Sequence, residues 1–194
     1  MSARNLCIAV FSLIALTAAG SAAAQNFSLT LGDKSARLGY GSYVGGSTYG
    51  RTEMNASLLY NTHDNRYLDL GLLVVDNAGS KNPGLEVGLG PKLMFFWHGD
   101  LNDQGLAIAL GGRLNFKPMQ FKRMRMGLSA FYAPTITSFI DARDVYELDA
   151  RVGYEILPTA SAYLGWRRIN ADFNKGHGRN NIDESGYLGM EFSF

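Results

Sequence analysis

Histidines with neighbouring acids are the residues of this sequence best suited to acid–base or metal chemistry. His63 is followed by Asp64, and His177 lies between Asp172 and Asp183. An Asp–His pair could activate water for hydrolysis, but aspartates are common in polar loops, where all five residues are expected. The three histidines show no metal-ligand spacing such as H-x-x-x-H, and no serine adjoins one of them. The sequence therefore predicts no catalytic residue, no bound metal and no cofactor.

The glycine-rich segment Asn174–Asn181 and the single Cys7 do not add a reactive site. NKGHGRNN lacks the G-x-x-x-x-G-K-[ST] order and the following helix of a phosphate loop. Cys7 lies in an apolar N-terminal stretch that is expected to be removed, which leaves no thiol for a disulfide or a metal. The net charge of +1 implies no attraction to nucleic acid.

Charged residues of both signs recur at every second position of several segments. An unpaired charge in a narrow low-dielectric interior costs several kcal/mol, so such charges are expected to pair. If water runs between them, the same charges would line a path for ions. The predicted lumen charge network consists of Arg123, Arg125, Glu147, Asp149, Arg151, Glu155, Arg167 and Glu191.

A period of two runs through nearly the whole chain after residue 24. DVYELDARVGYEIL, residues 144–157, places Tyr146, Leu148 and Val152 on one face and Glu147 and Arg151 on the other. This alternation predicts strands rather than helices. Several segments reach the 9–11 residues with which a tilted strand crosses a bilayer.

The glycines indicate which face points inward. They share the parity of the charged residues, where missing side chains would make room inside a narrow closed barrel. A polar interior with an apolar exterior is the arrangement of a membrane β-barrel, and a soluble lipocalin-like binder would have the opposite arrangement. These glycines are Gly71, Gly88, Gly90, Gly111, Gly127, Gly153, Gly165 and Gly189.

Ten segments carry the strand pattern, which predicts an all-β, antiparallel, up-and-down transmembrane barrel. The first two segments are short and could form one bent strand, so eight strands remain an alternative. Pro91 cannot donate to a strand ladder, and a bulge or local break is expected there. The segments are 26–32, 36–43, 52–60, 66–75, 84–97, 104–116, 122–132, 144–157, 159–169 and 185–194.

Aromatic residues on the apolar parity gather toward the ends of these segments. Two such girdles are expected at the two headgroup layers of a membrane. One set comprises Tyr60, Trp97, Tyr132, Tyr146 and Trp166, and the other comprises Phe116, Tyr154 and Phe194. Arg168, just beyond Trp166, is a candidate for contact with lipopolysaccharide phosphates, or it snorkels to the interface.

The N-terminal residues 1–24 have the features of a secretory signal peptide. Arg4 precedes an uncharged apolar run, and Ala22-Ala23-Ala24 presents small residues for cleavage. We expect cleavage after Ala24 and a barrel formed by residues 25–194. An even strand number would then place both termini in the periplasm and the longer loops outside.

The C-terminal strand GYLGMEFSF resembles the assembly signature of bacterial outer-membrane barrels, on Tyr187, Gly189, Phe192 and Phe194. The resemblance implies recognition by the barrel assembly machinery. Over most of residues 25–194 the sequence also resembles the YfaZ family, in segments such as GLEVGLGPKL, GLAIALGGRL, SAFYAP and YELDARVGYEILPTASAYLGWRRI. This second resemblance implies an outer-membrane precursor of Gram-negative bacteria and brings no catalytic residues.

These observations predict a small integral outer-membrane barrel without enzymatic activity, with a structural or interaction role and a charge-filled lumen. A narrow porin-like channel for ions or small solutes is the alternative, followed by a soluble lipocalin-like binder and a surface hydrolase. The expected partners are outer-membrane lipid, lipopolysaccharide and the assembly machinery. The sequence does not fix the oligomeric state.

Overall fold

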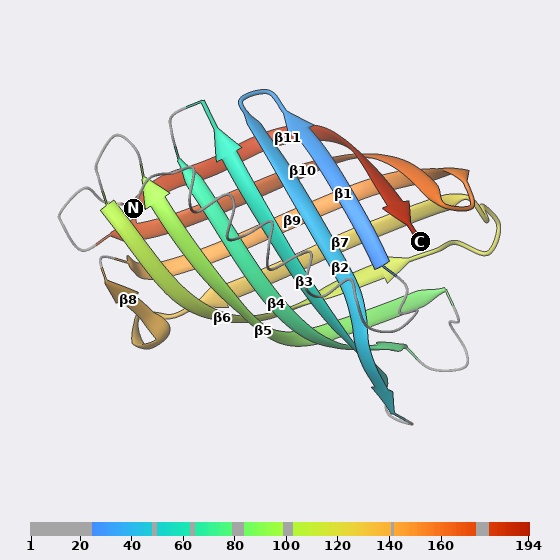
Figure 1. Cartoon of the computed structure of the whole chain (residues 1–194), viewed down its shortest axis with the longest axis horizontal. Coiled ribbons are helices and arrows are strands. Elements are labelled where there is room, and N and C mark those ends of the chain that lie inside the picture. The colour runs from blue at the N-terminus through green and yellow to red at the C-terminus, as the bar shows by residue number, and fades with distance from the viewer. Residues whose placement is uncertain are drawn as a thin grey trace.

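The computed structural model describes residues 25–47, 50–62, 65–78, 84–98, 103–140, 142–173 and 179–194 (Figure 1). The predicted signal peptide, residues 1–24, lies outside the described residues. The elements are β1 Gln25–Gly32, β2 Ser35–Ser47, β3 Gly50–Asn61, β4 Arg66–Asn77, β5 Leu85–His98, β6 Asp103–Phe116, β7 Met124–Ala133, the 3-10 turn η1 Thr135–Thr137, β8 Ser138–Ile140, β9 Ala142–Leu157, β10 Ala160–Phe173 and β11 Arg179–Ser193.

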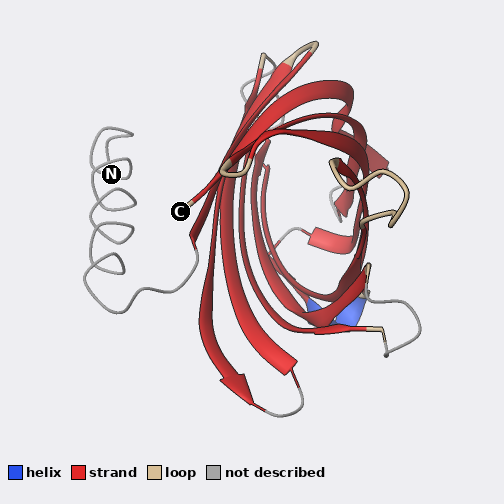
Figure 2. Ribbon diagram, turned by 90° about the vertical axis from the view of Figure 1, so that its right-hand side faces the viewer, coloured by secondary structure: helices blue, strands red, loops and turns tan. Residues whose placement is uncertain are grey.

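The strands form one antiparallel sheet that closes on itself. Neighbours follow the order β5-β4-β3-β2-β1-β11-β10-β9-β7-β6, and β6 pairs with β5 to complete the ring (Figure 2). The first and last strands are joined by β1–β11 pairing. At their ends the Gln25 amide donates to the Phe194 carbonyl at 3.2 Å, and the Phe194 amide donates back at 2.9 Å. The end of the barrel with Gln25 and Phe194 is called the terminal end, and the opposite end is called the far end.

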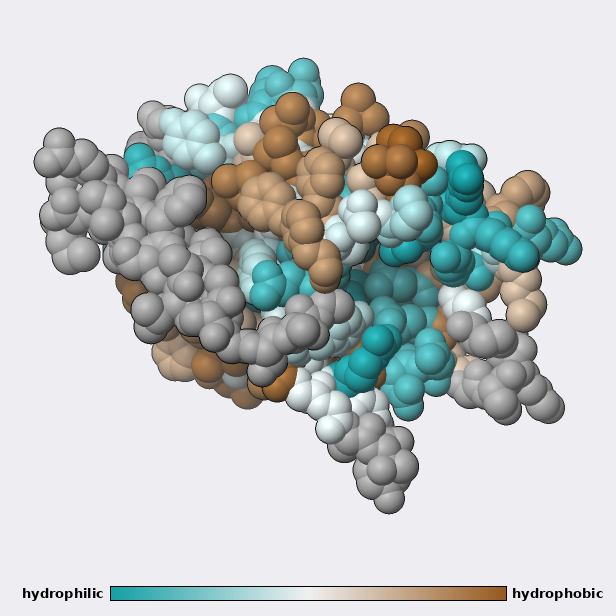
Figure 3. Space-filling view, turned by 45° about the vertical axis from the view of Figure 1, so that its right-hand side comes forward, coloured by the Kyte–Doolittle hydropathy of each residue, from teal (hydrophilic) through white to brown (hydrophobic). Residues whose placement is uncertain are grey.

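The outer wall is apolar, as a membrane-spanning barrel requires. On β4, Leu70, Leu72 and Val74 are 39–57% exposed, whereas the alternating Asp69 and Leu73 are buried. Figure 3 shows hydrophobic side chains gathered on the outer surface and hydrophilic ones in the central hollow. No helix among the described residues is long and apolar enough to cross a membrane. The apolar exterior excludes the soluble lipocalin-like alternative, because a soluble barrel would present polar side chains on that surface.

A charge placed on this outer wall should destabilise the barrel according to its depth. Leu164 on β10 is 61% exposed and lies between Ala160 and Trp166. Leu164→Arg is expected to lower the free energy of unfolding of the barrel in lipid vesicles by about 2–4 kcal/mol, the cost of arginine near the bilayer midplane. Leu157→Arg, at the terminal end of β9, is the matched control and should cost about 0–1 kcal/mol. Urea titrations would measure both, and equal losses at the two positions would contradict this membrane placement.

The ten long strands confirm the predicted count and exclude the eight-strand alternative, because β1 and β2 are separate strands. β10 and β11 extend beyond the predicted bounds to Phe173 and from Arg179, past a bulge between Ile169 and Asn170. These extensions are mostly polar, so the regular alternation that marked the other strands is missing there. The short β8, paired with β6, lies in a predicted loop.

Pro91 interrupts the sheet as predicted, although without a bulge. The β4–β5 ladder runs from Arg66↔Trp97 to Gly71↔Lys92 and resumes at Val74↔Leu89 in the same register. Two pairs are therefore missing beside Pro91, which has no N–H to donate to β4. The β5–β6 ladder on its other side is continuous, so the ring stays closed.

Candidate functional site in the barrel lumen

The middle of the lumen is crossed by a cluster of buried ion pairs centred on Glu147 of β9. Its carboxylate accepts hydrogen bonds from Arg37 Nη1 at 3.0 Å, Lys92 Nζ at 2.9 Å and the Tyr67 hydroxyl at 2.8 Å. Asp69 accepts a second bond from Arg37 Nη2 at 2.6 Å. The Glu147 and Asp69 side chains are each only 2% exposed. We call Arg37, Tyr67, Asp69, Lys92 and Glu147 the ion-pair layer.

The ion-pair layer spans the barrel rather than following one wall. Arg37 belongs to β2 and Glu147 to β9, and the ring places three strands between them on one side and five on the other. Ser57 of β3 supports the layer, because it accepts a bond from Arg37 Nε at 2.6 Å and donates to Asp69. The residues that meet here are as far as 110 positions apart in the chain. The layer therefore ties opposite walls together.

Between the ion-pair layer and the far end, the lumen is filled by apolar side chains. Phe96 stacks on Tyr67 with ring centroids 5.1 Å apart. The side chains of this apolar layer leave no more than 4% of their surface exposed, and they come from six strands. The layer consists of Leu59, Met94, Phe96, Phe131, Ala133, Val145, Ile169 and Ile182.

A second buried ion pair lies toward the far end. Arg167 Nε donates to Asp183 Oδ2 at 2.9 Å, and Arg167 Nη2 reaches the Ser35 hydroxyl at 3.4 Å. Ser185 donates to the same Asp183 carboxylate. Arg167 is 1% exposed, and a carboxylate of the neighbouring strand β11 pairs with this buried charge. This pair adds a further polar tie between β10, β11 and β2.

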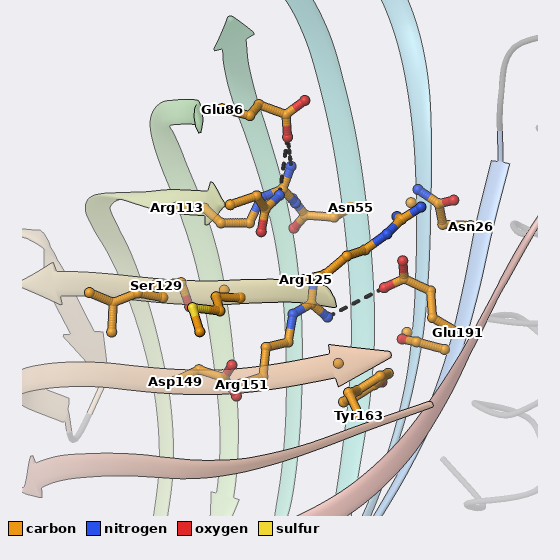
Figure 4. Close-up of a pocket in the computed structure, with 18 of the residues that line it drawn as sticks. Asn26, Asn55, Glu86, Arg113, Arg125, Ser129, Asp149, Arg151, Tyr163 and Glu191 are labelled. Atoms are coloured by element: carbon orange, nitrogen blue, oxygen red, sulfur yellow. Dashed lines mark hydrogen bonds and ion pairs between the residues drawn. The ribbon is translucent and has the colours of Figure 1, made fainter. Parts of the chain in front are cut away.

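The terminal half of the lumen is a cavity of about 910 Å³, which we call the vestibule. The ion-pair layer forms its floor, and residues of the terminal-end connections, such as Gly84 and Lys117, line its opposite side. Figure 4 shows the side chains of its wall. The vestibule therefore opens toward the terminal end and is closed toward the far end.

Most charged groups on the vestibule wall are engaged with a group of opposite charge. Arg113 binds both carboxylate oxygens of Glu53, at 2.8 and 2.7 Å. Across the cavity, Arg151 donates to Glu191 at 3.3 Å (Figure 4). Such pairing keeps the field in the lumen low despite the density of charge.

The residues of the predicted lumen charge network are distributed over the ion-pair layer, the ion pair nearer the far end and the vestibule. Glu147 centres the ion-pair layer, and Arg167 forms the pair nearer the far end. Arg125 donates to Glu155 at 2.9 Å near the terminal end. Asp149, Arg151 and Glu191 line the vestibule. Arg123 lies in the exposed turn before β7, outside the strand.

Sequence reasoning left out several partners of that network. Arg37, Glu53, Asp69, Lys92 and Arg113 face the same lumen from β2 to β6. Asp69, Lys92 and Arg113 share the parity of the inward glycines on their strands, and that signal could have placed these three. The apolar layer had a weaker signal, namely runs of adjacent apolar residues such as MFFW that break the alternation.

The predicted girdle residues lie outward near the two ends of the strands. Tyr60, Tyr132 and Trp166 are 41–52% exposed toward the far end. Trp97 and Tyr146, also nearer the far end, are partly covered. Phe116, Tyr154 and Phe194 are exposed nearer the terminal end.

The C-terminal signature residues differ in direction. Tyr187 points inward and donates to Asp149 at 2.7 Å. The Tyr163 ring lies over Gly189. Phe192 is partly covered on β11, and Phe194 is 81% exposed at the terminal end.

The histidine chemistry considered above falls largely outside the described residues, which exclude His63, Asp64 and His177. Within the described ranges, no group of three or more His, Cys, Asp or Glu side chains is placed to hold a metal ion. Arg168 faces outward, with Nε 3.6 Å from the Glu184 carboxylate.

Comparison with known proteins gave one family and a few structures of similar fold. A solved "KdgM porin" has a TM-score of 0.44 and 11% identity, covering 88% of this chain and 99% of the porin chain. A "NanC porin" structure has a TM-score of 0.39 and 12% identity, and the match covers 89% of this chain and 100% of the NanC chain. At this similarity no function or ligand is transferred from them. No curated protein matches the chain significantly.

The family comparison is more extensive. The family model described as "YfaZ precursor" matches residues 4–194. This match confirms the resemblance drawn from the strand segments and spans nearly the whole chain. The barrel therefore belongs to the YfaZ family.

Proposed function

We propose that this outer-membrane barrel is a non-enzymatic structural or interaction protein whose lumen does not conduct. The observation that carries the proposal is the closure of the lumen by two successive layers, the ion-pair layer and the apolar layer. An ion entering from the terminal end would first meet Arg37, Lys92 and Glu147, which already compensate one another. It would then have to lose its water among apolar side chains, and the polar groups beside them, Arg167 and Asp183, already pair with each other.

The support for a non-enzymatic role is the mutual engagement of the charged groups in the lumen. Glu147 and Glu53 each accept bonds from cationic side chains. A general base needs a free lone pair, and these carboxylates are already occupied by cationic donors. We place any interaction role at the two rims and on the lipid-facing wall. There we propose contacts with lipid and lipopolysaccharide, and recognition of the C-terminal strand by the assembly machinery.

A narrow channel is the second candidate, because the vestibule already opens half of the lumen to solvent. Single-channel recording in a planar bilayer separates the two functions. We expect no discrete conductance steps from protein whose folding is confirmed by heat-dependent migration on a gel. A conducting porin added to the same bilayer is the positive control.

Reproducible steps from the folded chain would overturn the closed-lumen proposal. In that case Arg151→Glu should shift ion selectivity toward cations, since Arg151 lines the vestibule. The exterior charge variant Arg168→Glu should leave selectivity unchanged.

A further inference from the structure

We propose that the vestibule is a binding site for an uncharged, polyhydroxylated solute of about disaccharide size, which enters from the terminal end. The proposal rests on the closed lumen proposed above, because a closed floor makes the vestibule a receptacle rather than a passage. Its volume of about 910 Å³ lies at the upper end of the range of ligand pockets, roughly 300–1,000 Å³.

The pairing of charges on the wall selects for an uncharged ligand. Arg113, Arg125 and Arg151 each have a carboxylate partner, at 2.7, 2.9 and 3.3 Å. A charged ligand would have to break one of these pairs and leave its other member uncompensated. A neutral ligand needs no such exchange. It can hydrogen-bond to the N–H groups that these arginines still expose to the cavity. The three arginine side chains are 20–45% exposed.

Unengaged amides and hydroxyls on the same wall select for hydroxyl groups. Within the described residues, the side chains of Asn26, Asn55 and Ser129 make no hydrogen bond to protein, although all three line the vestibule (Figure 4). An amide offers donors and an acceptor together, and a serine hydroxyl does both. Sugar hydroxyls also donate and accept, so each can be matched without a change of charge.

The lining residues also come from opposite walls, which favours a ligand with several hydroxyls over a small one. Asn26 belongs to β1 and Asn55 to β3, whereas Ser129 belongs to β7. The ring order places β7 four strands from β3 on one side and four strands from β1 on the other. A solute that reaches both sides has to span the lumen.

Isothermal titration calorimetry with maltose tests the proposal on the full chain purified from membranes. The detergent must be zwitterionic and free of sugar, because a maltoside headgroup would compete. We expect saturable binding of maltose, and at least about tenfold weaker binding of the charged probes glucuronate and glucosamine. Asn55→Ala should weaken the binding of maltose about 3- to 10-fold, as expected for the loss of one neutral hydrogen bond.

A matched pair on β7 locates the site. Ser129→Trp fills the vestibule and should abolish binding, whereas Ala130→Trp points outward and should change affinity less than about twofold. If Ser129→Trp does not fold, the double variant Asn26→Ala and Asn55→Ala takes its place, with at least about tenfold loss expected.

Two results would overturn the proposal. One is no heat with maltose for protein whose folding has been confirmed. The other is tighter binding of glucuronate or glucosamine than of maltose. Conductance keeps this outcome separate from the proposed function: a silent barrel that does not bind maltose refutes only the site, whereas a conducting barrel refutes the closed lumen whatever it binds.

Discussion

Replacing Glu147 by alanine is expected to lower the free energy of unfolding by about 3–5 kcal/mol, the usual cost of removing one partner from a buried ion pair. The Glu147 carboxylate accepts hydrogen bonds from Arg37, Lys92 and Tyr67. Without it, two cations would share only Asp69, which lies 3.8 Å from Lys92 Nζ. Urea unfolding followed by the fluorescence of the two tryptophans measures the loss.

Glu155→Ala is the matched control, since Glu155 is an inward glutamate on the same strand. Its partners Arg125 and Lys117 are 45% and 48% exposed. The expected loss there is about 0–1 kcal/mol, because water can solvate the released cations. A loss at Glu147 no larger than at Glu155 would mean that water reaches the middle of the lumen, and it would contradict the closed ion-pair layer.

Gly165→Ala should cost about 1–3 kcal/mol, because a methyl group has no room at that position. A Cβ built on Gly165 would lie 2.6 Å from the hydroxyl oxygen of Tyr187 and 2.7 Å from the Ala150 carbonyl oxygen. The Tyr187 ring could move only by giving up its bond to Asp149, and the Ala150 carbonyl belongs to the neighbouring strand. Unfolding in urea, compared with the unsubstituted chain, measures the effect.

Gly186→Ala provides the control for this substitution. Gly186 lies on β11, one residue from the pairing partner of Gly165, and faces outward with only a backbone oxygen 3.9 Å away. The same change should therefore be nearly neutral there, or slightly stabilising through the unfolded chain. Equal effects at the two glycines would show that strand propensity, rather than space in the lumen, sets their cost.

The strand arrangement could be predicted because a strand at a lipid–lumen boundary has a fixed period. Segment 144–157 alternates almost without exception, and its inward Glu147 and outward Leu148 follow from parity alone. Where both faces are apolar, parity fails. Phe96 and Phe131 fill the lumen although they stand on the polar side of their strands, because apolar side chains from several strands pack together there.

Partner choice within the lumen could not be predicted. Glu147 and Arg37 meet because their strands lie on opposite walls at the same height, and this height depends on the stagger of every strand between them. Sequence parity gives the direction of a side chain but not its level along the barrel axis. Arg123 illustrates the limit, since its parity matched that of Arg125 but β7 begins after it, at Met124.

The uneven filling of the lumen also determines where an electric field would act. In the closed lumen proposed above, a voltage applied across the membrane would fall mainly over the apolar layer, where packed side chains leave no path for water or ions. The vestibule, filled with electrolyte, would remain near the potential of the terminal side. A charge that crosses the full field gains about 2.3 kcal/mol per 100 mV. Arg37, Lys92 and Glu147 stand at the boundary of that field, so they are the groups on which a strong voltage would pull first.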